Sequence, residues 1–77
     1  MSASPERMIH DTNQIALFFA SYPHDKAVAG VAEHIAKFWE RRMKDQLFAY
    51  ADQGGAGLHA LVAEAISRLR QPQPAKG

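Results

Sequence analysis

Apolar residues recur at steps of three and four positions along most of the chain, which is the spacing of one face of a helix. No segment shows the sustained alternation of apolar and polar residues that is typical of a strand. The helical spacing covers four segments, about residues 5–21, 25–39, 41–53 and 58–70. We therefore expect an all-α fold, a small bundle of about four short helices with a disordered C-terminal tail.

Capping and breaking residues support these boundaries. Ser4 is suited to cap the first helix, because Pro5 then occupies the first helical position. Pro23 closes the first helix, since the residue before a proline is disfavoured in the helical region. Gly54 and Gly55 follow the third segment, as expected at a helix C-terminus.

The length of 77 residues limits the chain to one small domain. Residues 71–77 have alternating prolines and no apolar anchor, so we expect a flexible Pro/Gln tail after one helical domain over residues 1–70. A core of this size leaves little excess stability, and no disulfide can add to it because cysteine is absent. Either the helices pack unusually well or another protein surface completes the fold.

Two features of the second helix lie outside its apolar face. Gly30 lies off that face and is expected to weaken the helix slightly. Glu33 and Lys37 have i,i+4 spacing in the favourable order, so we expect them to pair on the exposed side.

The apolar faces are wider than a small core requires. The apolar residues of the first helix spread over roughly 180° of its circumference, whereas a core-facing stripe needs about 100°. Leu17 points away from these residues. On the third helix Phe48 lies about 140° from Met43, among polar neighbours. A single exposed apolar residue is ordinary, but several large rings together favour a docking surface. The set in question is Leu17, Phe38, Trp39 and Phe48.

Charge and hydropathy exclude several classes of partner. The chain carries 9 Lys+Arg and 8 Asp+Glu, a formal net charge of +1, whereas nucleic acid and anionic lipid require a large basic excess. No apolar run approaches the roughly 20 residues that a membrane span needs. The first residues lack the hydrophobic segment of a signal peptide, so we expect a cytoplasmic protein.

Motifs for catalysis or metal binding are not evident. The four histidines, His10, His24, His34 and His59, have no i,i+3 or i,i+4 spacing that would suit a metal, so we expect solvated or capping histidines. The glycines at 54–57 lack the strand and the Lys-Ser/Thr of a phosphate-binding loop. We therefore expect no catalytic, cofactor-binding or metal-binding residue in this chain.

One basic cluster leaves an alternative open. Arg41, Arg42 and Lys44 could contact phosphates in a small helical DNA-binding or regulatory protein. Glu40 and Asp45 flank the cluster, which weakens the positive field. The planar guanidinium of Arg42 also suits a carboxylate or carbonyl on a protein partner.

The order and spacing of several short motifs resemble the delta subunit of cytoplasmic NAD-dependent formate dehydrogenase. The motifs are Asn13-Gln14-Ile15-Ala16 with Phe18-Phe19, Gly30-Val31-Ala32-Glu33-His34-Ile35, Lys37-Phe38-Trp39-Glu40-Arg41-Arg42-Met43, and Gly54-Gly55-Ala56-Gly57-Leu58 with Leu61-Val62. The resemblance covers roughly residues 8 to 69. The family usually has a proline where this chain has Arg41, so the second and third helices could run on with only a bend.

The resemblance implies an accessory role. Enzymes of that type oxidise formate at a molybdenum or tungsten bis-pterin centre in a large alpha subunit. Beta and gamma subunits carry electrons through iron–sulfur clusters and FMN to NAD. The delta subunit binds no cofactor of its own and supports assembly, cofactor insertion or stability of the complex. We therefore expect a non-catalytic subunit that docks on the alpha subunit.

The partner-binding residues that we expect are on the first three helices. They are Asn13, Gln14, Leu17, Phe18, Phe38, Trp39, Arg42, Met43 and Phe48.

Overall fold

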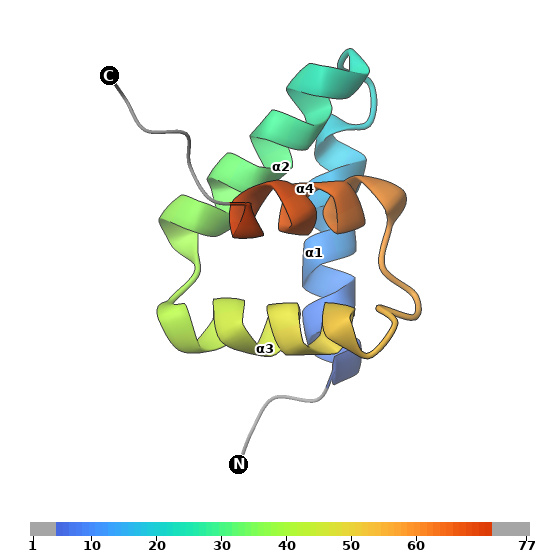
Figure 1. The fold of residues 1–77 in the computed structure, drawn as a ribbon. Coiled ribbons are helices and arrows are strands. Elements are labelled where there is room, and N and C mark those ends of the chain that lie inside the picture. The colour runs from blue at the N-terminus through green and yellow to red at the C-terminus, as the bar shows by residue number, and fades with distance from the viewer. Residues whose placement is uncertain (1–4, 72–77) are drawn as a thin grey trace, which may run out of the picture.

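A computed structural model describes residues 5–71, and Figure 1 shows its fold. The described part is all-α, as predicted, and contains no strand. The predictions of a Ser4 cap and of a flexible tail after residue 71 lie outside the described residues. The helices are α1 (Pro5–Phe19), α2 (His24–Phe38), α3 (Arg41–Asp52) and α4 (Ala60–Arg70).

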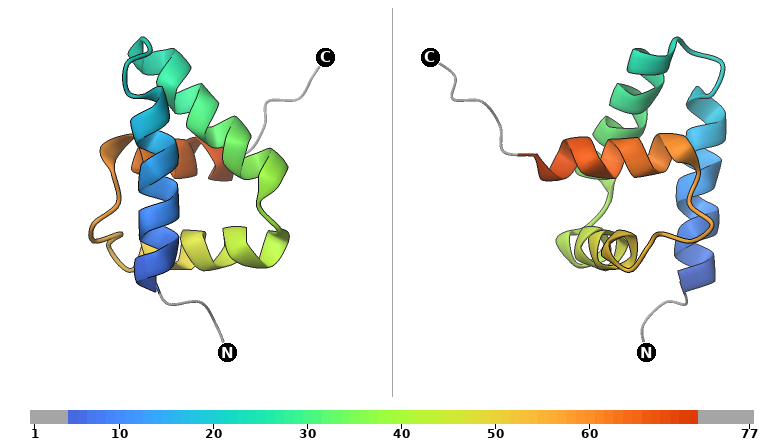
Figure 2. Two further views of the ribbon diagram at one scale, coloured as in Figure 1. Left: turned by 180° about the vertical axis from the view of Figure 1, so that it is seen from behind. Right: turned by 45° about the vertical axis from the view of Figure 1, so that its right-hand side comes forward.

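Helices α1 and α2 form a hairpin that is closed by a short turn, and α4 lies across it (Figure 1). Helix α3 lies near the N-terminal end of α1, on the side away from that turn, and the views in Figure 2 show the same arrangement from other sides. The turn begins where α1 ends at Phe19, because Tyr22 N–H donates to Phe19 O at 3.0 Å instead of continuing the helix. Pro23 then precedes α2, as its fixed φ favours.

The core lies where α1, α2 and α4 meet, and α3 contributes one buried side chain, Leu47. The only buried polar residue in the described range is Thr12, whose Oγ1 lies 3.0 Å from Ile9 O and is thereby satisfied within α1. The buried residues of α2 and α4 recur at steps of three and four positions, as the apolar spacing of the sequence predicted. The buried apolar residues are Ala16, Ala27, Val28, Val31, Ala32, Ile35, Leu47, Leu61, Val62, Ala65 and Ile66.

Helices α2 and α3 are separate, which answers the question raised by the missing proline. Trp39 (φ −97°, ψ 135°) and Glu40 (φ −68°, ψ 158°) are both extended. Trp39 N–H still donates to Ile35 O at 3.1 Å, and Lys44 N–H donates to Glu40 O at 3.0 Å in the first turn of α3. Two extended residues therefore produce the break without a proline.

Gly30 has a packing role that the sequence analysis missed. It lies where α2 meets α1, and a Cβ at this position would be 2.5 Å from Phe19 Cε1. The prediction that Gly30 lies off the apolar face was wrong, because the α1–α2 contact reaches beyond the stripe of large side chains. The predicted pair of Glu33 and Lys37 is confirmed, with Lys37 Nζ 3.0 Å from Glu33 Oε2.

The segment between α3 and α4 is longer than predicted. Helix α4 begins at Ala60, and not at Leu58, because His59 is extended and caps the helix: Leu61 N–H donates to His59 Nδ1 at 3.0 Å. Leu58 instead packs against the core from the loop. Gly54 (φ 115°) and Gly57 (φ 85°) adopt positive φ values that other residues rarely tolerate, so they allow the turn.

Candidate docking surface

An exposed apolar patch lies at the end of α1, beside the hairpin turn. We call Leu17, Phe18 and Tyr22 the hairpin patch; their exposed fractions are 58%, 69% and 46%. The partly buried ring of Phe19 anchors it, since its centroid is 5.0 Å from that of Phe18 and 5.4 Å from that of Tyr22. Leu17 and Phe18 were predicted partner contacts, and the structure places both on the surface.

A second exposed patch lies where α2 passes into α3. We call Phe38, Arg42 and Met43 the junction patch; Phe38 is 71% exposed and its ring centroid is 4.8 Å from that of His34. The adjacent Trp39 is only partly exposed, packs against the core and lines a cavity of about 60 Å³ together with Met8 and Met43.

The structure does not bring all the predicted partner contacts into one surface. The hairpin patch lies near the start of α2 and the junction patch lies at its end (Figure 1). A helix of 15 residues is about 22 Å long. A partner that contacts both patches must therefore extend along the hairpin.

The two predicted polar contacts on α1 differ in environment. Gln14 is exposed, but the amide of Asn13 holds the loop before α4. Asn13 Nδ2 donates to Gly57 O at 2.9 Å, and Asn13 Oδ1 accepts from His59 N–H at 2.8 Å. Asn13 therefore has a structural role that links α1 to residues more than forty positions later, and nothing in its local sequence indicated that role.

The prediction that Phe48 points outward among polar neighbours was wrong. Phe48 is half-buried and packs against the core, and the guanidinium carbon of Arg70 lies 5.3 Å from its ring centroid. Arg70 also donates from Nη1 to Asp52 Oδ1 at 2.5 Å. That hydrogen bond holds the pKa of the Asp52 carboxyl below its usual value, against a smaller opposing effect of desolvation, and raises the pKa of Arg70.

The basic cluster occupies the first turns of α3. Arg41 and Arg42 are exposed and form no ion pair within residues 5–71. Lys44 donates from Nζ to Ala36 O at 3.4 Å, near the end of α2. Because the N-terminal end of a helix carries partial positive charge, these cations add to a positive field instead of opposing it.

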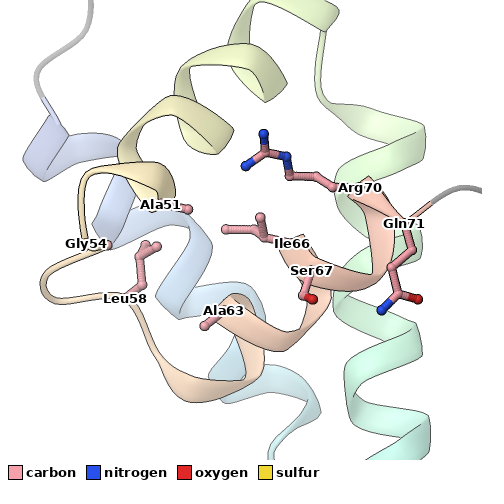
Figure 3. Close-up of a pocket in the computed structure, with 9 residues that line it drawn as sticks. Ala51, Gly54, Leu58, Ala63, Ile66, Ser67, Arg70 and Gln71 are labelled. Carbon is pink, nitrogen blue, oxygen red and sulfur yellow. The ribbon is translucent and has the colours of Figure 1, made fainter.

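Two hollows lie beside α3, and Figure 3 shows the first. It has a volume of about 510 Å³; Ala51, Leu58 and Ile66 point into it, and Arg70 extends towards α3. The second has a volume of about 370 Å³. Its lining is Ala36, Arg41, Lys44, Asp45, Phe48 and Leu69.

Within the described residues, the arrangement of the histidines and carboxylates differs from that of a metal site. Between residues 5 and 71, no three His, Asp or Glu side chains are grouped so that they could hold a metal ion. The prediction of capping or solvated histidines is confirmed for His59, which caps α4, and for His10, which is exposed. His24 is also exposed, with Nε2 2.9 Å from Glu64 Oε1. Over the same range, no helix has the length and apolar character that a membrane crossing requires.

The fold and these surfaces define a small helical protein with exposed apolar patches and a basic cluster at the start of α3. A family model described as the NADH-dependent formate dehydrogenase delta subunit FdsD matches residues 7–66. The chain therefore belongs to the formate dehydrogenase delta subunit family, which confirms the resemblance drawn from its motifs. Neither a curated protein nor a solved structure matches the chain.

Proposed function

We propose that this chain is a non-catalytic accessory subunit that docks on the large catalytic alpha subunit of an NAD-dependent formate dehydrogenase. The observation that carries the proposal is the exposure of Phe18 and Phe38, at 69% and 71%, in a member of the delta subunit family. Large exposed rings are suited to anchor an interface, because they bury much area with few rotatable bonds.

The energetic contribution of such docking is substantial. Burying one large apolar side chain contributes roughly 1.5–3 kcal/mol, so burial of the two patches offsets part of the association cost of about 4–15 kcal/mol. A subunit that binds only the correctly assembled form stabilises that form by mass action. In this way a small chain supports assembly, cofactor insertion or stability without contributing a reacting group.

The remaining parts of the complex follow from the proposal. The molybdenum or tungsten bis-pterin, the iron–sulfur clusters, FMN and the NAD site belong to the alpha, beta and gamma subunits, and the assembly is cytoplasmic. The DNA-binding alternative, based on Arg41, Arg42 and Lys44, has weaker support, because Asp45 lies among these cations and the net charge is only +1.

Co-purification with the alpha subunit tests the proposal. A tagged alpha subunit is expressed with beta, gamma and either the wild-type chain or the double variant Phe18→Ser/Phe38→Ser. We expect the wild-type chain to be retained and the double variant to be lost, because both rings are exposed and their removal leaves the core intact. The control Ala20→Ser/Ala29→Ser also changes exposed positions and should be retained. Failure of the wild-type chain to associate at any stage of assembly would refute the proposal.

A further inference from the structure

The two hollows beside α3 adjoin each other. Arg70 lines the first and Phe48 lines the second, and the guanidinium carbon of Arg70 is 5.3 Å from the ring centroid of Phe48. The stacked pair therefore lies between the two hollows, and we call the two hollows together the α3 groove. One half lies against α4 and the loop before it, and the other lies against the end of α2.

The floor of the α3 groove is apolar. Ala51, Leu58 and Ile66 contribute to one half, and Phe48 and Leu69 to the other. Helix α3 has only one buried residue, whereas α2 has five and α4 has four. The groove thus results from a helix that is loosely integrated into the core, and its floor can accept apolar side chains from another chain.

The charge on the groove is positive. Arg41, Lys44 and Arg70 line it, and Asp45 is the only carboxylate in the lining. Asp52 neutralises Arg70 in part, but Arg41 has no carboxylate partner within the described part of the chain. The partial positive charge at the start of α3 adds to the field in the same half.

We propose that the α3 groove binds an acidic amphipathic segment of another subunit of the complex, with apolar side chains on the floor and carboxylates beside Arg41 and Lys44. This inference rests on the proposed function and adds the chemistry of the contacted segment. Charge complementarity selects this occupant, because an apolar floor with cations on one rim fits an apolar segment that carries carboxylates. A nucleic acid fits less well, since a net charge of +1 gives little of the positive field that phosphates require.

Residues 72–77 are the other candidate occupant, because they follow Gln71, which lines the groove. Their only charged side chain is Lys76, which has the same sign as the groove. Charge complementarity therefore favours a separate acidic segment.

Site-specific photocrosslinking in the complete complex identifies the occupant. A benzophenone amino acid replaces Ala63 in one variant and Ala36 in another, since both alanines are exposed and each lines a different half of the groove. We expect both probes to crosslink to one segment of a partner subunit that contains apolar residues and at least two carboxylates. Crosslinks to a segment without carboxylates, to nucleic acid, or to residues 72–77 of the same chain would each overturn the inference.

Charge reversal provides the quantitative test. The variant Arg41→Glu/Lys44→Glu of the full chain should bind the dehydrogenase complex prepared without this subunit about tenfold or more weakly than wild type at low salt. The loss of affinity should be smaller at high salt. The control Lys26→Glu/Arg68→Glu makes the same change in net charge at residues that line neither half of the groove, and its affinity should stay within about threefold of wild type. Equal losses in both variants would show that only net charge matters and would contradict the inference.

A third variant addresses the floor. Ala63→Glu places a carboxylate in the groove at an exposed position of α4, so helicity by circular dichroism should match wild type while binding falls by about tenfold or more. Unchanged affinity in both Ala63→Glu and Arg41→Glu/Lys44→Glu would refute the groove as a contact. If Phe18→Ser/Phe38→Ser still abolished association, the proposed function would stand and only this inference would fail.

Discussion

The ring of Phe19 on α1 lies directly over Gly30 on α2, so a Cβ at position 30 would be 2.5 Å from Phe19 Cε1. Phe19 in turn contacts the exposed rings of Phe18 and Tyr22. The missing side chain at Gly30 therefore allows the two helices to close on a ring that anchors the hairpin patch. A single glycine thus couples core packing to the surface that we assign to docking.

Gly30→Ala should lower the free energy of unfolding by up to about 2 kcal/mol. An alanine gains about 1 kcal/mol of helix propensity over glycine, but overpacking against a half-buried ring costs typically 1–3 kcal/mol and should prevail. Urea denaturation of the purified chain measures the difference. In the Phe19→Ala background the clash is gone, so the same substitution should become stabilising. Stabilisation in the wild-type background would contradict the packing described for Gly30.

Two adjacent residues at the end of α2 should respond in opposite ways. Trp39 packs against the core, so Trp39→Ala should lower the free energy of unfolding by about 2 kcal/mol or more. Phe38 is 71% exposed, so Phe38→Ala should change it by no more than about 0.5 kcal/mol while weakening retention in the complex. Thermal unfolding and co-purification, measured on the same two variants, separate the roles. A destabilised Phe38→Ala chain with unchanged retention would reverse this assignment.

Asn13→Ala should lower the free energy of unfolding by about 1–3 kcal/mol, because it removes the partners of Gly57 O and His59 N–H together. Asn13→Asp keeps the acceptor for His59 N–H and loses only the donor, so its effect should be intermediate. Gln14→Ala, at the exposed neighbour, is the matched control and should be nearly neutral. Hydrogen exchange at His59 reports the same loss locally. Equal effects of Asn13→Ala and Gln14→Ala on the free energy of unfolding would show that Asn13 does not hold the loop before α4.

The contact of Asp52 with Arg70 should make stability depend on pH in acid. Since the hydrogen bond from Arg70 lowers the pKa of Asp52 in the folded state, its contribution is complete above the unfolded value of 3.8 and disappears as pH falls through the lower folded value. Arg70 stays protonated throughout this range. The difference in unfolding free energy between wild type and Asp52→Asn should therefore shrink between pH 6 and pH 3.

The variant Arg70→Gln provides the control for this acid dependence. In that background Asp52 has lost the guanidinium that contacts its carboxylate. The change in unfolding free energy caused by Asp52→Asn should therefore no longer depend on pH. Urea denaturation of all four chains at both pH values completes the double-mutant cycle. A difference that persists unchanged at pH 3 in the wild-type background would contradict the contact.

Local sequence patterns were sufficient for the helices and most of the core. The three- and four-residue spacing of Val28, Val31 and Ile35 requires only the geometry of one helix, and all three are buried. The glycines after α3 likewise indicated a turn, and they adopt positive φ values there. Helix boundaries were predicted less accurately. The start of α4, for example, depends on the capping conformation of the His59 side chain, which the spacing of apolar residues does not determine.

The candidate surface was predicted only in part, because several environments depend on residues far apart in the chain. Phe48 appeared free on its own helix, but Arg70, 22 positions later, covers its ring. The sequence pattern predicts a partner contact for Asn13, but its hydrogen bonds reach positions 57 and 59. Leu17, Phe18 and Phe38 were located correctly on the surface, since no distant element covers them. Their contact with a partner stays a prediction.

Titration of the purified chain into the dehydrogenase complex prepared without it tests the central claim most directly. Calorimetry or native mass spectrometry measures whether the chain binds saturably to the subassembly that contains the alpha subunit. The account predicts saturable binding with a dissociation constant in the micromolar range or tighter, about −8 kcal/mol, and loss of that binding in Phe18→Ser/Phe38→Ser. A chain that is folded by circular dichroism but shows no binding to any form of the complex would contradict it.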